Sequence, residues 1–226
     1  MTLHPFSLFR PFEDAITTAI FDKHDDVRSD ADAAKRLGID ETRTAGVHQV
    51  HGRDVIIVRE PTYRTVKADG MLTDQKNLLL CTRWADCQNF AVYIPEKNII
   101  GVLHAGWKGL VAGAIPSFFE TLKREWEVDA ADAYIAAGPS LCQKCADFTD
   151  PKTELSGIPS ELIDGKYADL RGWADRQLFD CGVQPAHFER HIDCTRCSPE
   201  NFWTYRGGHR DDVKNSHTNM LTIALR

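Results

Sequence analysis

Three residues of types that bind zinc stand in the middle of the chain, each near the end of an apolar segment. His51 lies in HQVHGRDV, Cys87 in WADCQNF and His104 at the end of NIIGVLHAGW. Imidazole and thiolate suit zinc, and a site with three protein ligands keeps a fourth position for water or substrate. An ion held in this way lowers the pKa of a bound water or polarises a substrate atom. Together the three residues predict a catalytic zinc site.

Each residue taken alone has a plainer interpretation. His48 precedes His51 by three positions, so on an extended strand the two rings face opposite sides and only one of them is a ligand. An isolated cysteine is commonly a small buried hydrophobe, and a buried histidine can be satisfied by backbone groups alone. For His104, a metal on one ring nitrogen and a carbonyl or carboxylate on the other would satisfy both. Asp86 is expected to point away from the neighbouring thiol and to cap a turn or orient a ligand.

Two further cysteine pairs offer an alternative metal site. Cys142 and Cys145 form one C-x-x-C pair and Cys194 and Cys197 form another, and each has the internal spacing of a structural zinc site. If these pairs were the important site, the protein would be an interaction module rather than an enzyme. Removing the first pair would then unfold it, whereas Cys87→Ala would be mild.

Composition limits the class of protein and its partners. The chain has 226 residues, 42% hydrophobic and 27% charged, which is ordinary for a globular protein, and its formal net charge is -6. Without a basic excess, nucleic acid is not an expected partner. The first sixteen residues mix Arg, Glu and Asp with apolar residues, so neither a signal peptide nor a membrane segment is predicted. We expect a cytoplasmic protein with reduced thiols that binds small molecules.

The elements that must position these residues are short strands followed by a few helices. Strands are predicted at VHQV, DVIIVRE, LLLCTRW, NFAVYI, IIGVLHA, AYIAAG, AHFERHI, NFWTYR and NMLTIALR. Apolar residues at steps of three and four predict helices over 110–126 and 167–181, and a shorter helix is predicted through DADAAKRLG. Residues 1–40 are otherwise polar and weakly periodic. We therefore predict an α+β fold with mixed β-sheets in a layered sandwich flanked by helices, in a single domain over residues 1–226.

The order of the motifs resembles that of a known family. HQVHG, WADC, HAGWKG, AAGPSLCQKCADF and CTRCSPENFWTYR follow one another as in the multicopper-oxidase-like laccase-domain family, whose bacterial members are called purine nucleoside phosphorylases or peptidoglycan editing factors. The resemblance runs from about His48 to the C-terminus. It implies that His51, Cys87 and His104 are the metal ligands. It also implies phosphorolysis of adenosine, inosine or guanosine to the base and ribose 1-phosphate, with adenosine deamination and methylthioadenosine phosphorolysis as further activities.

The two main reactions need different side chains. Phosphorolysis needs cations that hold phosphate against the anomeric carbon, whereas deamination needs a carboxylate that moves a proton. Lys108 and Arg206 are the candidates for the phosphate site, and either would otherwise be a surface cation. Asp147 lies where the family has an acidic residue, so it is a candidate substrate contact or an ordinary turn carboxylate.

Several positions depart from the family pattern. No RHGGVS-like stretch occurs near the N-terminus, and residues 216–219 read SHTN where a TGR-like element is usual. Lys108 replaces the usual arginine and lacks its planar fork, and Ala146 replaces an aromatic residue. These changes predict altered substrate recognition around a retained metal site.

Two other enzyme classes use the same residues. In a thiol hydrolase, Cys87 would be the nucleophile and His104 or His51 the base, with an amide of a peptidoglycan precursor as the substrate. Copper oxidation of phenols is less favoured, because it calls for several copper centres and only one set of two histidines and one cysteine can be assembled.

Overall fold

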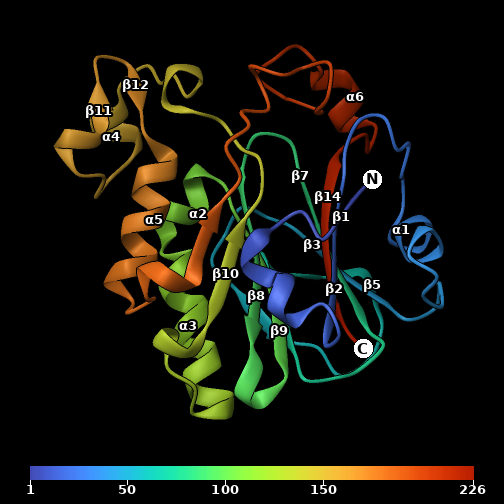
Figure 1. Ribbon diagram of the computed structural model, residues 1–226. Helices are drawn as coiled ribbons and strands as arrows, with labels where there is room; N and C mark the ends of the chain where they lie inside the picture. Colours follow the sequence, from blue (N-terminus) through green and yellow to red (C-terminus); the bar gives the residue numbers. More distant parts are fainter.

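The computed structural model covers residues 1–226, and its centre is a pair of six-stranded mixed sheets packed face to face (Figure 1). Sheet A has the order β1 (Thr2–Leu3), β2 (Ile16–Phe21), β14 (Asn219–Leu225), β7 (Leu79–Trp84), β3 (Thr44–His48), β5 (Thr62–Lys67). Sheet B has the order β13 (Phe188–Arg190), β10 (Tyr134–Ala137), β8 (Gln88–Ile94), β9 (Ile99–Ala105), β6 (Gly70–Thr73), β4 (Val55–Ile57). The α-helices are α1 (Asp30–Arg36), α2 (Trp107–Ala112), α3 (Ala114–Trp126), α4 (Pro151–Glu154), α5 (Leu170–Asp180) and α6 (Arg210–Lys214). The predicted α+β sandwich is confirmed.

The central strands are apolar at successive positions because both of their faces are buried. In β8, Phe90, Val92 and Ile94 belong to the core beneath the helices, whereas Ala91 and Tyr93 belong to the core between the two sheets. A strand enclosed on both faces loses the usual alternation of apolar and polar residues. This explains the continuous apolar run NFAVYI.

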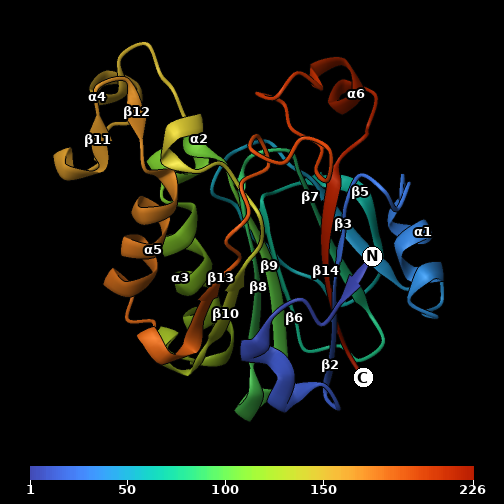
Figure 2. The ribbon, with the colours of Figure 1, turned by 45° about the horizontal axis from the view of Figure 1, so that its top comes forward.

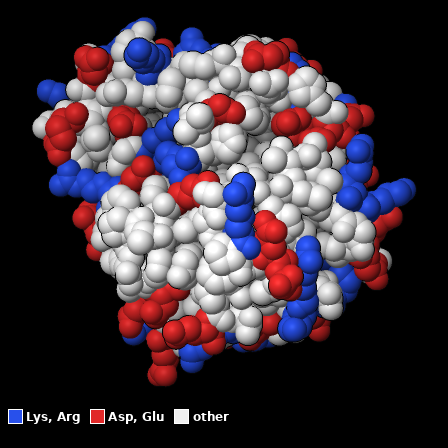
Figure 3. All heavy atoms as spheres, viewed as in Figure 1, with Lys and Arg blue, Asp and Glu red and all other residues white.

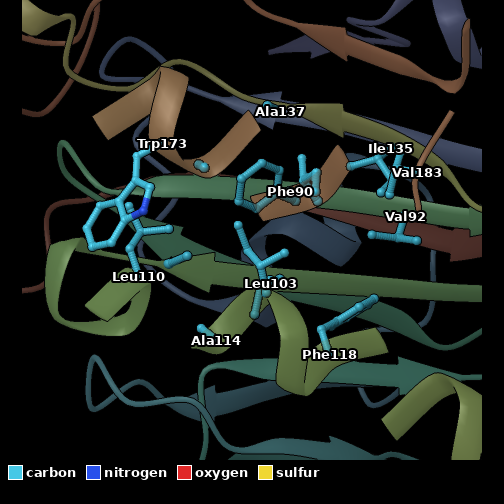
Figure 4. Close-up of a cluster of buried hydrophobic side chains, with 14 of the residues drawn as sticks. Phe90, Val92, Leu103, Leu110, Ala114, Phe118, Ile135, Ala137, Trp173 and Val183 are labelled. Atoms are coloured by element: carbon cyan, nitrogen blue, oxygen red, sulfur yellow. The ribbon is translucent and has the colours of Figure 1, made fainter. Parts of the chain in front are cut away.

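Helices cover the outer face of each sheet. Helices α2, α3 and α5 pack on sheet B, where Phe118 and Trp173 lie against the strand residues Phe90 and Leu103 in one cluster (Figure 4). On the opposite side, Ala33 of α1 packs against sheet A. The molecule is therefore layered as helices, sheet B, sheet A and helix (Figure 1).

Three predicted elements differ from the structure. The long helix over 110–126 is two helices, α2 and α3, because Gly113 adopts the left-handed conformation with φ of 81° and ends the first of them. Residues 167–168 form strand β12, which pairs with β11 (Ile163–Asp164), and Asp169 then caps α5. The predicted strand NFWTYR is a loop, since the side chain of Asn219 satisfies the backbone groups of Trp203 that a sheet would otherwise pair.

The first forty residues hold a buried strand that their sequence did not predict. Strand β2, with the sequence ITTAIF, lies between β1 and β14 in sheet A. The threonines hid the apolar pattern, although Thr18 is fully buried and β2 pairs with β14 along its whole length. The predicted helix near Gly38 is confirmed as α1, which begins with a capping box between Ser29 and Asp32.

Two segments outside the two large sheets stand at one end of the sandwich (Figure 2). The β11–β12 hairpin with α4 stands on one side of this end and the α6 segment on the other (Figure 2). Acidic and basic side chains intermix over the face shown in Figure 3. None of the helices has the length and apolar character needed to cross a bilayer.

Candidate metal centre and pocket

A cavity of about 810 Å³ opens among the strand ends beside the α6 segment. His51, Cys87 and His104 all line it. His51 follows β3, Cys87 lies in the turn between β7 and β8, and His104 is near the end of β9. Three distant segments of the chain therefore place their donor atoms on one wall.

The three side chains form one compact group. Their potential ligand atoms lie within 4.8 Å of one another, and the rings of His51 and His104 meet edge to face with centroids 4.9 Å apart. His104 is buried, Cys87 is half-buried and His51 is exposed, so the group spans from the core to the cavity. This arrangement can hold one ion with an open side. His48 ends β3 and also lines the cavity, but it is not part of the group.

Asp69 positions both histidines, and sequence reasoning missed it. Its carboxylate lies 2.9 Å from Nδ1 of His104 and accepts hydrogen bonds from the backbone N–H groups of Val50, His51 and Gly52. Burial raises the pKa of Asp69, but the contact with His104 and the N–H donors outweigh it and hold the pKa below its usual value. With Nδ1 engaged by a carboxylate, Nε2 of His104 is left to face the thiol and an ion.

The backbone of His51 completes this arrangement. His51 has a φ of 59° and lies in a tight bend, and strand β3 ends at His48, two residues before the end of the predicted strand VHQV. Asp69 stabilises the bend through the three N–H bonds. The only visible signal for Asp69 was the Asp69-Gly70 pair that begins β6, a common turn pattern.

Cys87 is an unusually acidic thiol. Burial alone would raise its pKa, but the neighbouring imidazoles, His104 first, lower it to about 6. The same contact with the thiolate and with Asp69 raises the pKa of His104 to about 9 despite burial. A Cβ at Gly106 would lie 2.9 Å from both Sγ of Cys87 and Cδ2 of His51, so a larger residue at this position would displace one or both side chains.

Asp86, which precedes Cys87, links the turn of the thiol to the loop after β13. Its φ is 84°, and its carboxylate accepts hydrogen bonds from the hydroxyls of Thr195 and Thr204 and from the backbone N–H of Arg206. It is buried and is not part of the ligand group around Cys87. Asp86 therefore holds the loop after β13 against the turn that carries the thiol.

The three predicted substrate contacts have different surroundings. Lys108 and Arg206 line the cavity, with the Lys108 ammonium 5.4 Å from the centroid of Trp107. Asp147 does not line it, but its side-chain oxygen lies 3.1 Å from the guanidinium of Arg206 and also pairs with Arg196. Asp147 thus holds the guanidinium of Arg206 in place.

Two more arginines line the cavity and were not predicted. Arg64 and Arg83 share the carboxylate of Asp30 at 2.7 Å and 3.3 Å, and Nε of Arg83 is buried without a hydrogen-bond partner. The one hint was a lone arginine inside the apolar run LLLCTRW. Asp86 is the only acidic residue among the lining residues, which include four Lys or Arg side chains.

The C-x-x-C pairs also meet. Cys142, Cys145, Cys194 and Cys197 have all four sulfurs within 4.8 Å of one another. None of the four lines the cavity. Two separate groups in this chain could therefore hold a metal ion.

Comparisons with known proteins agree with the fold and the motifs. A family model described as "Multi-copper polyphenol oxidoreductase laccase" matches residues 15–220. A purine nucleoside phosphorylase of Streptomyces coelicolor is 30% identical over 184 residues, covering 77% of this chain and 74% of the relative. An adenosine deaminase, RL5, from an unknown prokaryotic organism is 26% identical over 76% of this chain and 73% of the relative. The crystal structure of YlmD from Geobacillus stearothermophilus shares the fold, with a TM-score of 0.81 and 23% identity over 96% and 94% of the two chains.

Proposed function

Because the chain belongs to the multi-copper polyphenol oxidoreductase laccase family, we propose that it is a zinc-dependent purine nucleoside phosphorylase. It converts adenosine, inosine or guanosine and phosphate into the free base and ribose 1-phosphate. Methylthioadenosine phosphorolysis and adenosine deamination are its side activities. The whole of residues 1–226 serves as one enzyme domain, and it acts in the cytoplasm, where its seven cysteines stay reduced.

The observation that carries this proposal is the composition of the cavity wall. Four cationic side chains and a single, fully engaged carboxylate surround the group formed by His51, Cys87 and His104. Asp30 pairs with Arg64 and Arg83, and Asp147 pairs with Arg206, which leaves Lys108 as the lining cation without an ion pair. Lys108 can therefore attract an anionic co-substrate such as phosphate to this wall. The wall supplies no free carboxylate for the proton transfer that deamination needs, which ranks phosphorolysis above deamination.

The residues of the pocket divide the work of phosphorolysis. Lys108 and Arg206 hold the phosphate against the anomeric carbon, and Asp147 fixes the direction of the Arg206 guanidinium through its 3.1 Å contact. Asp69 keeps the His104 ring in one orientation. Indole and phenol rings of Trp107 and Tyr205 on the wall provide flat surfaces for a purine.

His51, Cys87 and His104 are the ligands of the proposed ion. Two imidazoles and one thiolate suit zinc, and the lowered pKa of Cys87 keeps the thiol in the ionised form that a metal requires. Bound zinc would polarise an oxygen or nitrogen atom of the substrate. Copper fits less well, because oxidase chemistry calls for several copper centres and the cavity holds one such ligand set.

The test uses protein of known metal content. Incubation with inosine and phosphate should yield hypoxanthine and ribose 1-phosphate, and incubation with adenosine but no phosphate should yield only inosine. Cys87→Ala and His104→Ala should lose this activity, whereas Cys181→Ala, at the end of α5, should keep it. Product formation that persists unchanged in the first two variants would contradict the proposed mechanism.

A thiol hydrolase is the second candidate, because Asp69, His104 and Cys87 are arranged as an orienting acid, a base and a nucleophile. Its substrate would be an amide of a peptidoglycan precursor. Chelation that leaves the fold intact, as checked by circular dichroism, separates the two functions. Loss of activity on removing the metal, with restoration by zinc, supports the phosphorylase. Activity on an amide that survives chelation but is lost when iodoacetamide alkylates Cys87 supports the hydrolase.

A further inference from the structure

A second group of potential metal ligands, made of four cysteines, lies outside the catalytic pocket. Cys142 precedes a short 3-10 helix, Gln143–Cys145, and Cys145 is its last residue, in the segment after β10. Cys194 forms an isolated β-bridge with Ser140 after β13, and Cys197 lies in the turn that follows. All four cysteines are free. Cys142 and Cys194 are separated by 52 positions in the sequence. The fold therefore brings four thiols together from two distant segments.

The spacing of the sulfurs matches a single tetrahedral ion. Sγ of Cys197 lies 3.9 Å from Sγ of Cys142 and 3.5 Å from Sγ of Cys145. Zinc bonds to thiolate at about 2.3 Å, which places the four corners of a tetrahedron about 3.8 Å apart. A disulfide would need about 2.05 Å. The observed distances correspond to neighbouring ligands of one ion and not to bonded sulfurs.

Hydrogen bonds from a backbone N–H and from a guanidinium support the cluster. The N–H of Cys142 donates to Sγ of Cys194 across 3.3 Å. The guanidinium of Arg171, on α5, donates to the carbonyls of Ser140, Ile192 and Asp193, and so ties both cysteine segments to the same helix. The thiols thus lie in segments that are already held side by side.

We propose that these four cysteines bind one structural zinc ion, separate from the ion of the catalytic pocket. Four protein ligands fill the tetrahedron, so this ion has no open position and no part in the chemistry. The assignment stands on the cysteine cluster alone and does not depend on the proposed phosphorylase function. A fully bound protein then carries two zinc ions per chain.

The ion would fix one wall of the catalytic pocket. Thr195, between Cys194 and Cys197, donates to Asp86 across 2.7 Å, and Asp86 precedes Cys87. Arg196 donates to the carbonyl of Cys145 and pairs with Asp147, which holds Arg206. The cysteine cluster therefore joins the two loops that support the thiol turn and the phosphate-binding arginine.

Metal analysis of the full chain, purified with a reducing agent and without chelators, tests the proposal. The unchanged protein should contain two zinc ions per chain. Cys197→Ser should retain one, and the double variant Cys87→Ala/His104→Ala should also retain one. Cys181→Ala, which changes a cysteine outside both groups, should retain two.

A spectroscopic measurement keeps the test valid if Cys197→Ser does not fold. Replacing the bound metal of the Cys87→Ala/His104→Ala variant with cobalt should give the intense absorption of tetrahedral cobalt bound to four thiolates. A single ion in the unchanged protein that disappears in this double variant would overturn the proposal. A disulfide among the four cysteines, detected as fewer than seven free thiols after denaturation, would overturn it too, and iron in place of zinc would overturn the choice of metal.

Discussion

The histidine–cysteine group of the pocket and the four-cysteine cluster are both suited to a soft metal ion, but they differ in number of ligands and in access. The pocket group has three donors on the wall of a cavity of about 810 Å³. The cluster has four donors, and none of them lines that cavity. Three donors leave room for a substrate atom, whereas four exclude it. Zinc can thus take part in catalysis at the pocket group and stabilise the fold at the four-cysteine cluster.

The two groups also differ in the residues that support them. The pocket group depends on a buried carboxylate, Asp69, that orients one imidazole and the bend carrying the other. The cluster depends on the backbone N–H of Cys142 and on the guanidinium of Arg171 on α5. We therefore expect substitutions at the cluster to change stability first and substitutions at the pocket to change activity first.

The largest expected effect is on folding. The double variant Cys142→Ala/Cys145→Ala loses two of four zinc ligands, and structural zinc contributes about 10–16 kcal/mol in small zinc domains, as much as the whole stability of many domains. We expect loss of cooperative thermal unfolding, measured by circular dichroism. In a chain of this size, a change of about 1 kcal/mol in the free energy of unfolding shifts Tm by about 4 °C. A smaller fall in Tm would contradict a stabilising role for the four-cysteine cluster. Cys181→Ala is the matched control.

The next effect tests the space around the pocket group. In Gly106→Ala the new methyl meets Cys87 and His51 at 2.9 Å, so the two ligands must move apart. Overpacking costs about 1–3 kcal/mol, and we expect zinc affinity of the pocket to fall by about 100-fold. Gly52→Ala is the nearby control, because its Cβ would meet its neighbours at 3.5 Å or more. Equal affinities in the two variants, measured by competition with a chelator, would refute the crowding argument.

A smaller effect is expected from the carboxylate behind His104. Asp69→Asn keeps the shape but removes the charge that orients the ring, and changes of this kind cost about 10- to 100-fold in metal affinity or activity. We expect this loss in the pocket together with an unchanged cobalt spectrum of the four-cysteine cluster. A change in both metal sites would mean that Asp69 acts on the fold as a whole.

The smallest effect concerns the exposed cation of the pocket. Lys108→Ala should raise KM for phosphate by about tenfold, since one charge-assisted hydrogen bond contributes about 1.5 kcal/mol or more. Lys108→Arg should retain the low KM. The steady-state rate as a function of phosphate concentration is the measurement. An unchanged KM in Lys108→Ala would leave Arg206 and the two unpredicted arginines as the phosphate ligands.

Several strands, one helix end and the cysteine group could be predicted because each depends on a pattern of neighbouring residues. The apolar runs of β8 and β9 and the helix stop at Gly38 depend on neighbouring residues only. The spacing of the C-x-x-C pairs likewise predicted a four-cysteine group, and the structure brings its sulfurs together. The ligand role of His51, Cys87 and His104 stays a prediction, although their donor atoms do meet.

The rest depended on contacts between distant segments. Asp69 lies 35 positions from His104 and 18 from His51, and no local pattern links them. The choice between His48 and His51 could not be made from strand alternation, because the chain leaves the strand before His51. Strand β2 was missed because its buried threonines look polar until β14 covers them.

The position of β14 in the middle of sheet A has a consequence for the order of folding. Thr222 of β14 contacts the carbonyl of Ala19 across 203 positions of sequence, whereas the hairpin of β8 and β9 closes over a few residues. Closing a long loop is slow and comes after local pairing. We therefore expect the β8–β9 hairpin to form before β14 inserts between β2 and β7 in sheet A. A chain arrested before that step would expose its apolar inter-sheet face and be prone to aggregation.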